Sequence, residues 1–201
     1  MKSTVKCFIF DYYKTLANDN YFNLPEEYDS KISESLYRNE NFKELLDDWW
    51  IGKINSNDIV NHLSKELLLS PKFLLDNLKF QARNMKLNRS VFRFSKQVRS
   101  KGYFTAIATI NSDIFNSDVI PGLELNKYFD CIINSFDYKI AEKHILCKIA
   151  MDKIDKNLNY NDCLLIDDTE ENVNKFISMG GKGYRYTNDE EFEKWLKDKN
   201  I

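Results

Sequence analysis

The chain has 201 residues, of which 43% are hydrophobic and 30% are charged, a composition typical of a soluble folded protein and not of a disordered one. The formal net charge is −2, so no overall basic field attracts nucleic acid or an anionic membrane, and neither is expected as a partner. No apolar run approaches the roughly 20 residues of a membrane span. The N-terminal residues lack the apolar segment of a signal peptide, which predicts a cytoplasmic protein.

The first predicted element is a strand at Val5–Phe10, and the long stretch after it reads as helices throughout. Pro25 suits the first turn of one helix, while Ser56 and Ser70 are candidate N-caps for two more. Between Pro25 and Ser56 lies an apolar stripe at helical spacing, which we expect to belong mainly to the core and in part to line a pocket: Phe42, Leu45, Leu46, Trp49 and Trp50. We therefore predict a helical cap domain at residues 18–87, inserted into a core domain of residues 1–17 and 88–201.

The rest of the chain alternates apolar runs with amphipathic segments. The predicted strands are Phe104–Ala108, Cys131–Asn134, Cys163–Ile166 and Gly183–Tyr186. The predicted helices are Asn88–Ser100, Ile145–Ile154, Glu170–Met179 and a last one that begins after Asn188. Continuously apolar strands are typical of a parallel sheet covered on both faces. The sequence thus predicts an α/β fold, with a three-layer Rossmann-like core around a parallel five-stranded sheet.

Polar residues follow the predicted strands where each strand ends. Asp11 follows the first, Thr109 and Ser135 follow the second and third, and Asp167-Asp168 follows the fourth. In an open parallel sheet, ligands bind at the carboxyl ends of the strands. Three carboxylates that converge there would raise one another's pKa or recruit a divalent cation. With oxygen ligands and no His or Cys nearby, Mg²⁺ is favoured over zinc.

These motifs resemble those of the haloacid dehalogenase (HAD) superfamily, which includes many phosphatases. Its opening signature is a strand that ends Asp-x-Asp-x-Thr, which here reads Asp11-Tyr12-Tyr13-Lys14-Thr15. Its second is a strand ending in Thr or Ser, here Thr109, and its third is a Lys ahead of a helix. The fourth and most specific is Asp-Asp after a strand with Asn four residues beyond, here Asp167-Asp168 and Asn172. The resemblance covers the whole chain, with a helical cap inserted after the first motif.

The resemblance implies a role for each matching residue. Asp11 would be the nucleophile that forms an aspartyl-phosphate. Mg²⁺ would be held by Asp11, the main-chain carbonyl of Tyr13 and Asp168, with Asp167 in or near the shell behind these ligands. The implied substrate is a small-molecule phosphate ester, and the resemblance carries no indication of the oligomeric state.

The resemblance also implies a phosphate site. Thr109 and the backbone N–H of Ile110 would hold phosphate oxygens, and a Lys would neutralise charge on the transferring group. Lys143 is the better candidate for this Lys, just ahead of the helix predicted at Ile145–Ile154. Lys139 is the alternative, because neither spacing matches the family pattern well.

Two departures leave the function open. Phosphatases of the superfamily place a general acid, Asp, where this chain has Tyr13, and Gly where it has Lys14. The first reading is an Mg²⁺-dependent phosphatase. The second is a hydrolase resembling the 2-haloacid dehalogenases, which carry Asp-x-Tyr in the first motif. Those enzymes need an Arg near the cap, for which Arg38 is the candidate here. They lack the Asp-Asp pair of the fourth motif. The third is a catalytically reduced relative that binds a ligand or a protein.

Overall fold

The computed structural model describes residues 5–26, 28, 31 and 40–199. Its sheet has five parallel strands in the order β3-β2-β1-β4-β5, which are β1 (Cys7–Phe10), β2 (Phe104–Thr109), β3 (Cys131–Asn134), β4 (Cys163–Asp167) and β5 (Lys182–Arg185). The five strands confirm the predicted parallel sheet. Because β1 and β4 are neighbours, the two acidic strand ends lie side by side.

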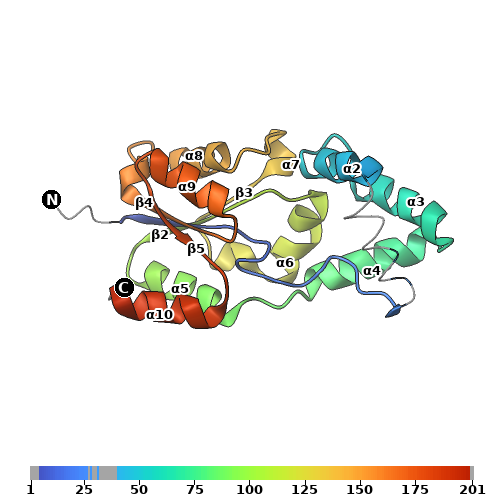
Figure 1. Cartoon of the computed structure of the whole chain (residues 1–201), viewed down its shortest axis with the longest axis horizontal. Helices are drawn as coiled ribbons and strands as arrows, with labels where there is room; N and C mark the ends of the chain where they lie inside the picture. Colours follow the sequence, from blue (N-terminus) through green and yellow to red (C-terminus); the bar gives the residue numbers. More distant parts are fainter. Residues whose placement is uncertain (1–4, 27, 29–30, 32–39, 200–201) are drawn as a thin grey trace.

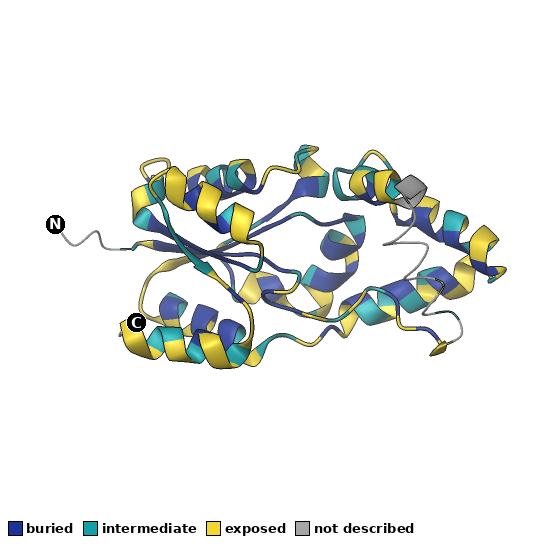
Figure 2. Ribbon diagram, in the orientation of Figure 1, coloured by how far each residue is buried: buried dark blue, intermediate teal, exposed yellow. Residues whose placement is uncertain are grey.

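Helices cover both faces of the sheet and make a three-layer α/β fold, as predicted. One face carries α8 (Lys143–Ile154) and α9 (Glu170–Ser178), and the other carries α5 (Arg89–Ser100) and α10 (Asp189–Lys199) (Figure 1). Side chains alternate along β1: Cys7 and Ile9 pack toward α8, while Phe8 and Phe10 pack toward α5. The inner strands β1 and β4 are therefore buried on both sides, whereas the edge strand β5 is only partly buried (Figure 2).

Three further helices, here called the inserted helices, lie between β1 and β2 in the sequence: α2 (Glu40–Trp50), α3 (Ser56–Leu67) and α4 (Pro71–Arg83). They form one end of the molecule, beyond the carboxyl ends of the strands (Figure 1). Their buried residues, such as Ile59 and Leu74, belong to the same hydrophobic cluster as Phe10 on the sheet. The inserted helices thus pack directly onto the α/β part of the chain.

Some predicted boundaries are wrong by a few residues. Helix α8 begins at Lys143 and not at Ile145, and the last strand is Lys182–Arg185 and not Gly183–Tyr186. The N-cap of α3 is Asn55, whose side chain accepts a hydrogen bond from the Asn57 N–H. Asn and Ser are comparable N-caps, so the two adjacent candidates could not be separated by residue type.

Several short elements have no counterpart in the predictions. They are a π-helical turn (Phe115–Val119), α6 (Ile120–Gly122), two 3₁₀ turns (Leu125–Lys127 and Tyr160–Asp162) and α7 (Ser135–Tyr138). The helix expected at Pro25 lies largely outside the described residues, and Arg38 lies outside them altogether. Within the described ranges, no helix is both long enough and apolar enough to cross a bilayer.

Candidate active site

A buried ion pair joins the ends of β1 and β4 to the start of α8. Asp11 follows β1, and its backbone N–H donates to the carbonyl of Ile166 at 2.9 Å. The Nζ atom of Lys143 lies 2.5 Å from Asp11 Oδ1 and 3.2 Å from Asp167 Oδ2. It also donates to the carbonyl of Ala108 at 2.9 Å. The helix start at Lys143 therefore places one buried ammonium between two strand-end carboxylates.

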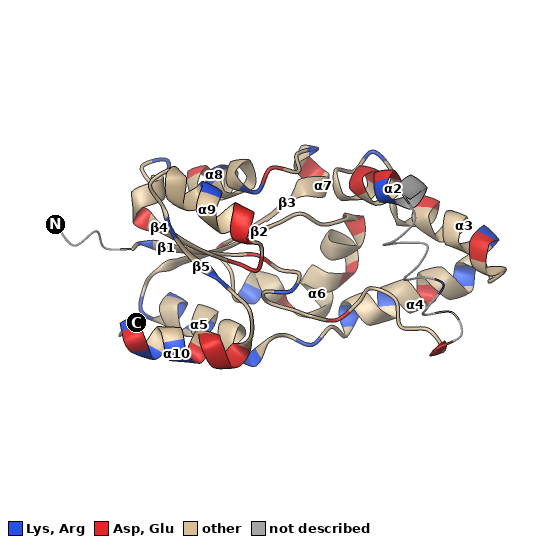
Figure 3. Cartoon of the chain, in the orientation of Figure 1, with Lys and Arg blue, Asp and Glu red and all other residues tan. Residues whose placement is uncertain are grey.

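Three carboxylates gather at this point, as the strand-end motifs predict. Asp11, Asp167 and Asp168 each offer an oxygen atom, and these atoms lie within 4.8 Å of one another. Asp167 is fully buried and accepts hydrogen bonds from the Thr169 N–H at 2.9 Å and from Asn172 Nδ2 at 3.1 Å. Acidic segments of ribbon are visible in the loops at this end of the sheet (Figure 3). We call Asp11, Lys143, Asp167 and Asp168 the acidic floor.

The acidic floor carries more negative than positive charge. Burial raises the pKa of Asp11, and the nearby Lys143 ammonium opposes that rise. Burial lowers the pKa of Lys143, but Asp11 and Asp167 raise it by more, so Lys143 remains protonated. Burial and the neighbouring Asp167 also raise the pKa of Asp168. One ammonium among three carboxylates leaves a deficit of positive charge that suits a divalent cation.

The loop after Asp11 has a tight backbone. Its carbonyl at Tyr12 accepts hydrogen bonds from the N–H groups of Leu16 at 2.8 Å and of Ala17 at 2.9 Å. Lys14 has a φ of 60°, a left-handed conformation that glycine adopts at least cost. The turn expected of the family motif therefore forms here with a lysine at the position where the family has Gly.

The two adjacent tyrosines of this loop face different surroundings. Tyr12 is fully buried, and its hydroxyl donates to Met85 Sδ at 3.3 Å. Tyr13 lines the cavity beside Asp11, and its hydroxyl donates to Asn20 Oδ1 at 3.3 Å. Only Tyr13 is thus in a position to affect chemistry at Asp11.

The end of β2 contributes an unpaired hydroxyl. Thr109 is fully buried, and among the described residues its Oγ1 atom has no hydrogen-bond partner. The next residue, Ile110, lines the same cavity as Asp11. An unsatisfied buried hydroxyl costs free energy unless a ligand or water completes its hydrogen bonds. The strand end is therefore suited to bind an oxygen-rich group.

The structure separates the two candidate lysines. Lys143 lies in the acidic floor, whereas Lys139 is exposed and donates to the carbonyl of Gly52. Lys139 follows the short helix α7 and has a φ of 60°. The helix α7 turns this lysine toward the inserted helices, so Lys139 does not reach the three carboxylates.

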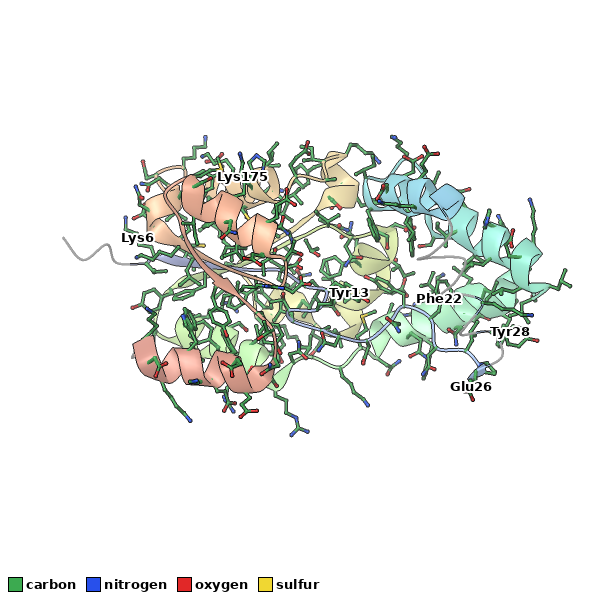
Figure 4. All side chains as sticks on the ribbon, viewed as in Figure 1. Lys6, Tyr13, Phe22, Glu26, Tyr28 and Lys175 are labelled. Carbon is green, nitrogen blue, oxygen red and sulfur yellow. The ribbon has the colours of Figure 1, made fainter. Side chains whose placement is uncertain are left out.

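The acidic floor opens into a cavity of about 570 Å³. Its opposite side is formed by apolar and aromatic side chains from α2 and the segment before it, namely Tyr21, Phe22, Leu46, Trp49 and Trp50. We call these five residues the aromatic wall. Figure 4 labels Tyr13 between the strand ends and the inserted helices, with Phe22 farther toward α4. The cavity thus lies between the sheet and the inserted helices.

Two residues of the loop after β2, Asn111 and Asp113, hold this wall in place. Asp113 Oδ1 accepts hydrogen bonds from Trp49 Nε1 at 2.7 Å and from Ser56 Oγ at 2.6 Å. Tyr21 donates through its hydroxyl to Asn111 Oδ1 at 2.6 Å. The polar run Asn111-Ser112-Asp113, directly after a buried strand, is the signal in the sequence by which this loop could have been singled out.

The strand end at Ser135 also contacts the inserted helices. Its Oγ atom accepts from the Asn111 N–H at 2.8 Å and lies 2.6 Å from the carbonyl of Trp50. Ser135 therefore links the loop after β2 to the end of α2, and it lies outside the acidic floor.

No protein-family model matches the sequence, and no curated protein matches it at a significant level. Solved structures do match. A HAD family enzyme from Bacteroides thetaiotaomicron, in complex with magnesium and inorganic phosphate, is 17% identical over 91% of this chain and 94% of that one, with a TM-score of 0.66. A predicted HAD-like family hydrolase from Porphyromonas gingivalis is 15% identical over 98% of each chain, with a TM-score of 0.67.

A dehalogenase is also similar in structure. The L-2-haloacid dehalogenase from Xanthobacter autotrophicus, with chloropropionic acid covalently bound, is 13% identical over 98% of this chain and 84% of that one, with a TM-score of 0.61. The neighbours therefore include both magnesium-binding and dehalogenating enzymes of one superfamily. Together with the strand-end motifs, these similarities show that the chain has the fold of the haloacid dehalogenase superfamily.

Proposed function

We propose that this protein is a hydrolase, and specifically an Mg²⁺-dependent phosphatase that acts on a small phosphate ester through an aspartyl-phosphate. The observation that carries the proposal is the acidic floor, in which three carboxylates gather and the ammonium of Lys143 contacts two of them. The end of β2 adds the buried hydroxyl of Thr109, which is unpaired among the described residues and precedes Ile110 in the cavity lining. The carboxylates of the floor suit a hard divalent cation, and the Thr109 hydroxyl suits a phosphate oxygen.

The residues present fit a magnesium ion. Asp11 and Asp168 would hold it together with the main-chain carbonyl of Tyr13, and Asp167 would lie behind them, hydrogen-bonded to Asn172. This chain has Tyr13 where the resembling phosphatases have Asp, but the expected metal ligand there is the main-chain carbonyl, which both residue types provide. When bound, the metal supplies positive charge that offsets the charge of the carboxylates and the phosphoryl oxygens.

The chain's own residues would carry the reaction. An Asp11 oxygen attacks phosphorus, the bond from phosphorus to the ester oxygen breaks, and the leaving group departs with the electron pair. Lys143 and Thr109 stabilise the charge on the transferring group. Water then attacks the phosphorus of the aspartyl-phosphate, which releases inorganic phosphate and restores the Asp11 carboxylate, while the proton of the water passes to the phosphate.

The inserted helices would act as a cap. We assign residues 18–87 to this cap and residues 1–17 and 88–201 to the core domain. In support, three of the residues that line the cavity, Leu46, Trp49 and Trp50, come from α2. A cap of this kind excludes water from the reacting groups and selects the leaving group.

A haloacid dehalogenase is the second candidate. It is favoured by Tyr13 in the first motif and by the structural similarity to the Xanthobacter enzyme. Asp168 argues against it, because Asp168 completes the Asp-Asp pair that the 2-haloacid dehalogenases lack. A catalytically reduced binding protein is the third candidate, favoured by Tyr13 together with the strained Lys14.

Phosphate release from 4-nitrophenyl phosphate, with and without Mg²⁺, tests the proposal. We expect hydrolysis that depends on Mg²⁺ and disappears in Asp11→Asn, which keeps the shape of the side chain but removes the attacking charge. Asp152→Asn is the matched control, because Asp152 is exposed on α8 and pairs only locally with Lys148. Hydrolysis that persists in Asp11→Asn would reject the proposal, and release of halide from a 2-haloacid without Mg²⁺ would favour the dehalogenase.

A further inference from the structure

The two sides of the cavity differ in chemistry, and the difference indicates what the leaving group is. The acidic floor is charged, while the aromatic wall opposite it is largely apolar and contains Tyr21, Trp49 and Trp50. A substrate that spans the cavity would place its phosphate at the floor and its leaving group against the wall. Cavities of this size, about 570 Å³, accommodate a phosphoryl group with one or two rings.

The aromatic wall is held by the same loop that presents the phosphate site. Trp49 Nε1 donates to Asp113 at 2.7 Å, and the Tyr21 hydroxyl donates to Asn111 at 2.6 Å. The ring centroids of Tyr21 and Trp49 are 6.2 Å apart. Asn111 and Asp113 follow Thr109 by two and four residues. The rings are therefore fixed relative to the phosphate site, which is the arrangement that an aromatic ligand needs.

The cavity has little positive charge left for a second anionic group. Among the described residues that line it, the cationic ones are Lys14 and Lys143. Lys143 already contacts two carboxylates of the acidic floor. Lys14 lies on the first-motif loop, with its Nζ atom 5.6 Å from the centroid of the Tyr13 ring. In the described part of the lining, neither lysine belongs to the aromatic wall, so an uncharged leaving group fits against that wall.

The first motif limits the leaving group further. Tyr13 stands where the resembling phosphatases place a general acid, and a phenol is a much weaker acid than the carboxyl group that it replaces. Its hydroxyl donates to Asn20, so its proton is directed to that amide oxygen. A leaving group that receives no proton in the transition state must be a stable anion, as a phenolate is and an alkoxide is not.

We propose that the substrates are phosphate monoesters of uncharged phenols, bound with the phenol ring against Trp49 and Tyr21. This inference rests on the proposed phosphatase function. As Asp11 bonds to phosphorus, the bond to the aryl oxygen breaks, and the phenolate leaves with the electron pair and takes a proton from water. Trp49 would determine specificity, and Asp113 would be a positioning residue that acts through Trp49.

The test compares two esters whose leaving alcohols are similarly acidic, phenyl phosphate and hexafluoroisopropyl phosphate. Only phenyl phosphate has an aromatic ring. The two esters therefore have similar leaving groups in acidity, and they differ in whether the aromatic wall can bind a ring. With saturating Mg²⁺, we expect kcat/KM to be at least about tenfold higher for phenyl phosphate. Equal values for the two esters would overturn the inference and leave the phosphatase function standing.

Variants of Trp49 locate the effect. Trp49→Leu should reduce the preference for phenyl phosphate to less than about threefold, and Trp49→Phe, which keeps a ring and protects against a failure to fold, should retain most of it. Asp113→Asn should raise KM for phenyl phosphate and leave kcat nearly unchanged, because it loosens Trp49 and does not touch the reacting atoms. An unchanged preference in folded Trp49→Leu would reject this role of Trp49.

A binding measurement tests the recognition of the aromatic ring separately from the proposed phosphatase activity. Quenching of tryptophan fluorescence reports binding of phenylphosphonate and methylphosphonate, neither of which the protein can hydrolyse at the carbon–phosphorus bond by this route. We expect phenylphosphonate to bind at least about tenfold more tightly. Tighter binding of phenylphosphonate without hydrolysis of either ester would support aromatic recognition and overturn the phosphatase. Equal binding of the two phosphonates would overturn aromatic recognition.

Discussion

The acidic floor and the aromatic wall face each other across one cavity, yet they are stabilised in different ways. The floor is built from strand ends and the start of α8, and its charged groups contact one another at 2.5 Å and 3.2 Å. The wall comes from the inserted helices and the segment before them, and hydrogen bonds to the loop after β2 hold it. The floor holds the acidic residues and the lysine to which we assign phosphoryl transfer, whereas the wall holds the aromatic residues to which we assign recognition of the leaving group. Predictions that act on the two sides separately can therefore test each role.

The largest expected effect is on the floor. Lys143→Met should lower the free energy of unfolding by about 3 kcal/mol, because it leaves buried carboxylates without their counter-charge. Lys139→Met is the matched control and should change it by less than about 0.5 kcal/mol, since Lys139 is exposed. Urea unfolding of the three proteins measures both values. Similar stability of the two variants would contradict a central electrostatic role for Lys143.

Binding of Mg²⁺ should have the next largest effect. A cation that binds only the folded protein raises the free energy of unfolding by about 2.7 kcal/mol at a hundredfold excess over its Kd. Asp168→Ala should abolish this stabilisation, whereas Asp152→Ala on the surface of α8 should retain it. Thermal unfolding across millimolar Mg²⁺, with and without inorganic phosphate, gives the answer. A melting temperature that never responds would reject the metal site.

Substitution of Tyr13, which lines the cavity beside Asp11, tests whether the site lacks a proton donor for the leaving group. Tyr13→Asp should raise the hydrolysis of alkyl phosphates at least about tenfold, because it restores an acid that contributes typically 10²–10⁴-fold where it is well placed. Tyr13→Phe is the control and should bring no gain. The ratio of aryl to alkyl ester turnover, with folding verified, is the measurement. Efficient alkyl hydrolysis by the parent protein would show that another group delivers the proton.

The smallest expected effect concerns the backbone of the first motif. Lys14→Gly should raise the free energy of unfolding by about 0.5 to 1 kcal/mol, since φ is 60° there and glycine adopts that conformation without a Cβ penalty. Lys101→Gly, at a φ of −85°, should lower it by a similar amount. Chemical denaturation distinguishes the two signs. A loss of stability in Lys14→Gly would mean that the lysine side chain contributes more than the strain costs.

Much of the floor could be predicted from the sequence because it depends on strand ends. Continuous apolar runs identified β1 and β4, and the carboxylates directly after them had to meet once the two strands paired. The sequence favoured Lys143 but left Lys139 as an alternative, because the choice depended on where α8 begins and on the short helix α7. The helix α7 has four residues, Ser135–Tyr138, too few for a periodic pattern.

The wall was less accessible to prediction. The stripe that contains Trp49 has the same helical spacing whether it packs in a core or lines a cavity, and Trp49 does both. What orients this ring is Asp113, which lies 64 positions away in the sequence. Sequence periodicity reports which face of a helix is apolar, and it does not report the distant side chain that fixes one ring on that face.

Trapping of the covalent intermediate tests the central claim most directly. Protein quenched in acid during turnover of phenyl phosphate with Mg²⁺ can be digested and mapped by mass spectrometry. We expect one phosphoryl group on the peptide that contains Asp11, released by hydroxylamine as an acyl phosphate is, and missing from Asp11→Asn and from samples without Mg²⁺. A phosphoryl group on any other side chain, or steady turnover with none on Asp11 at any quench time, would contradict the assignment of Asp11 as the nucleophile.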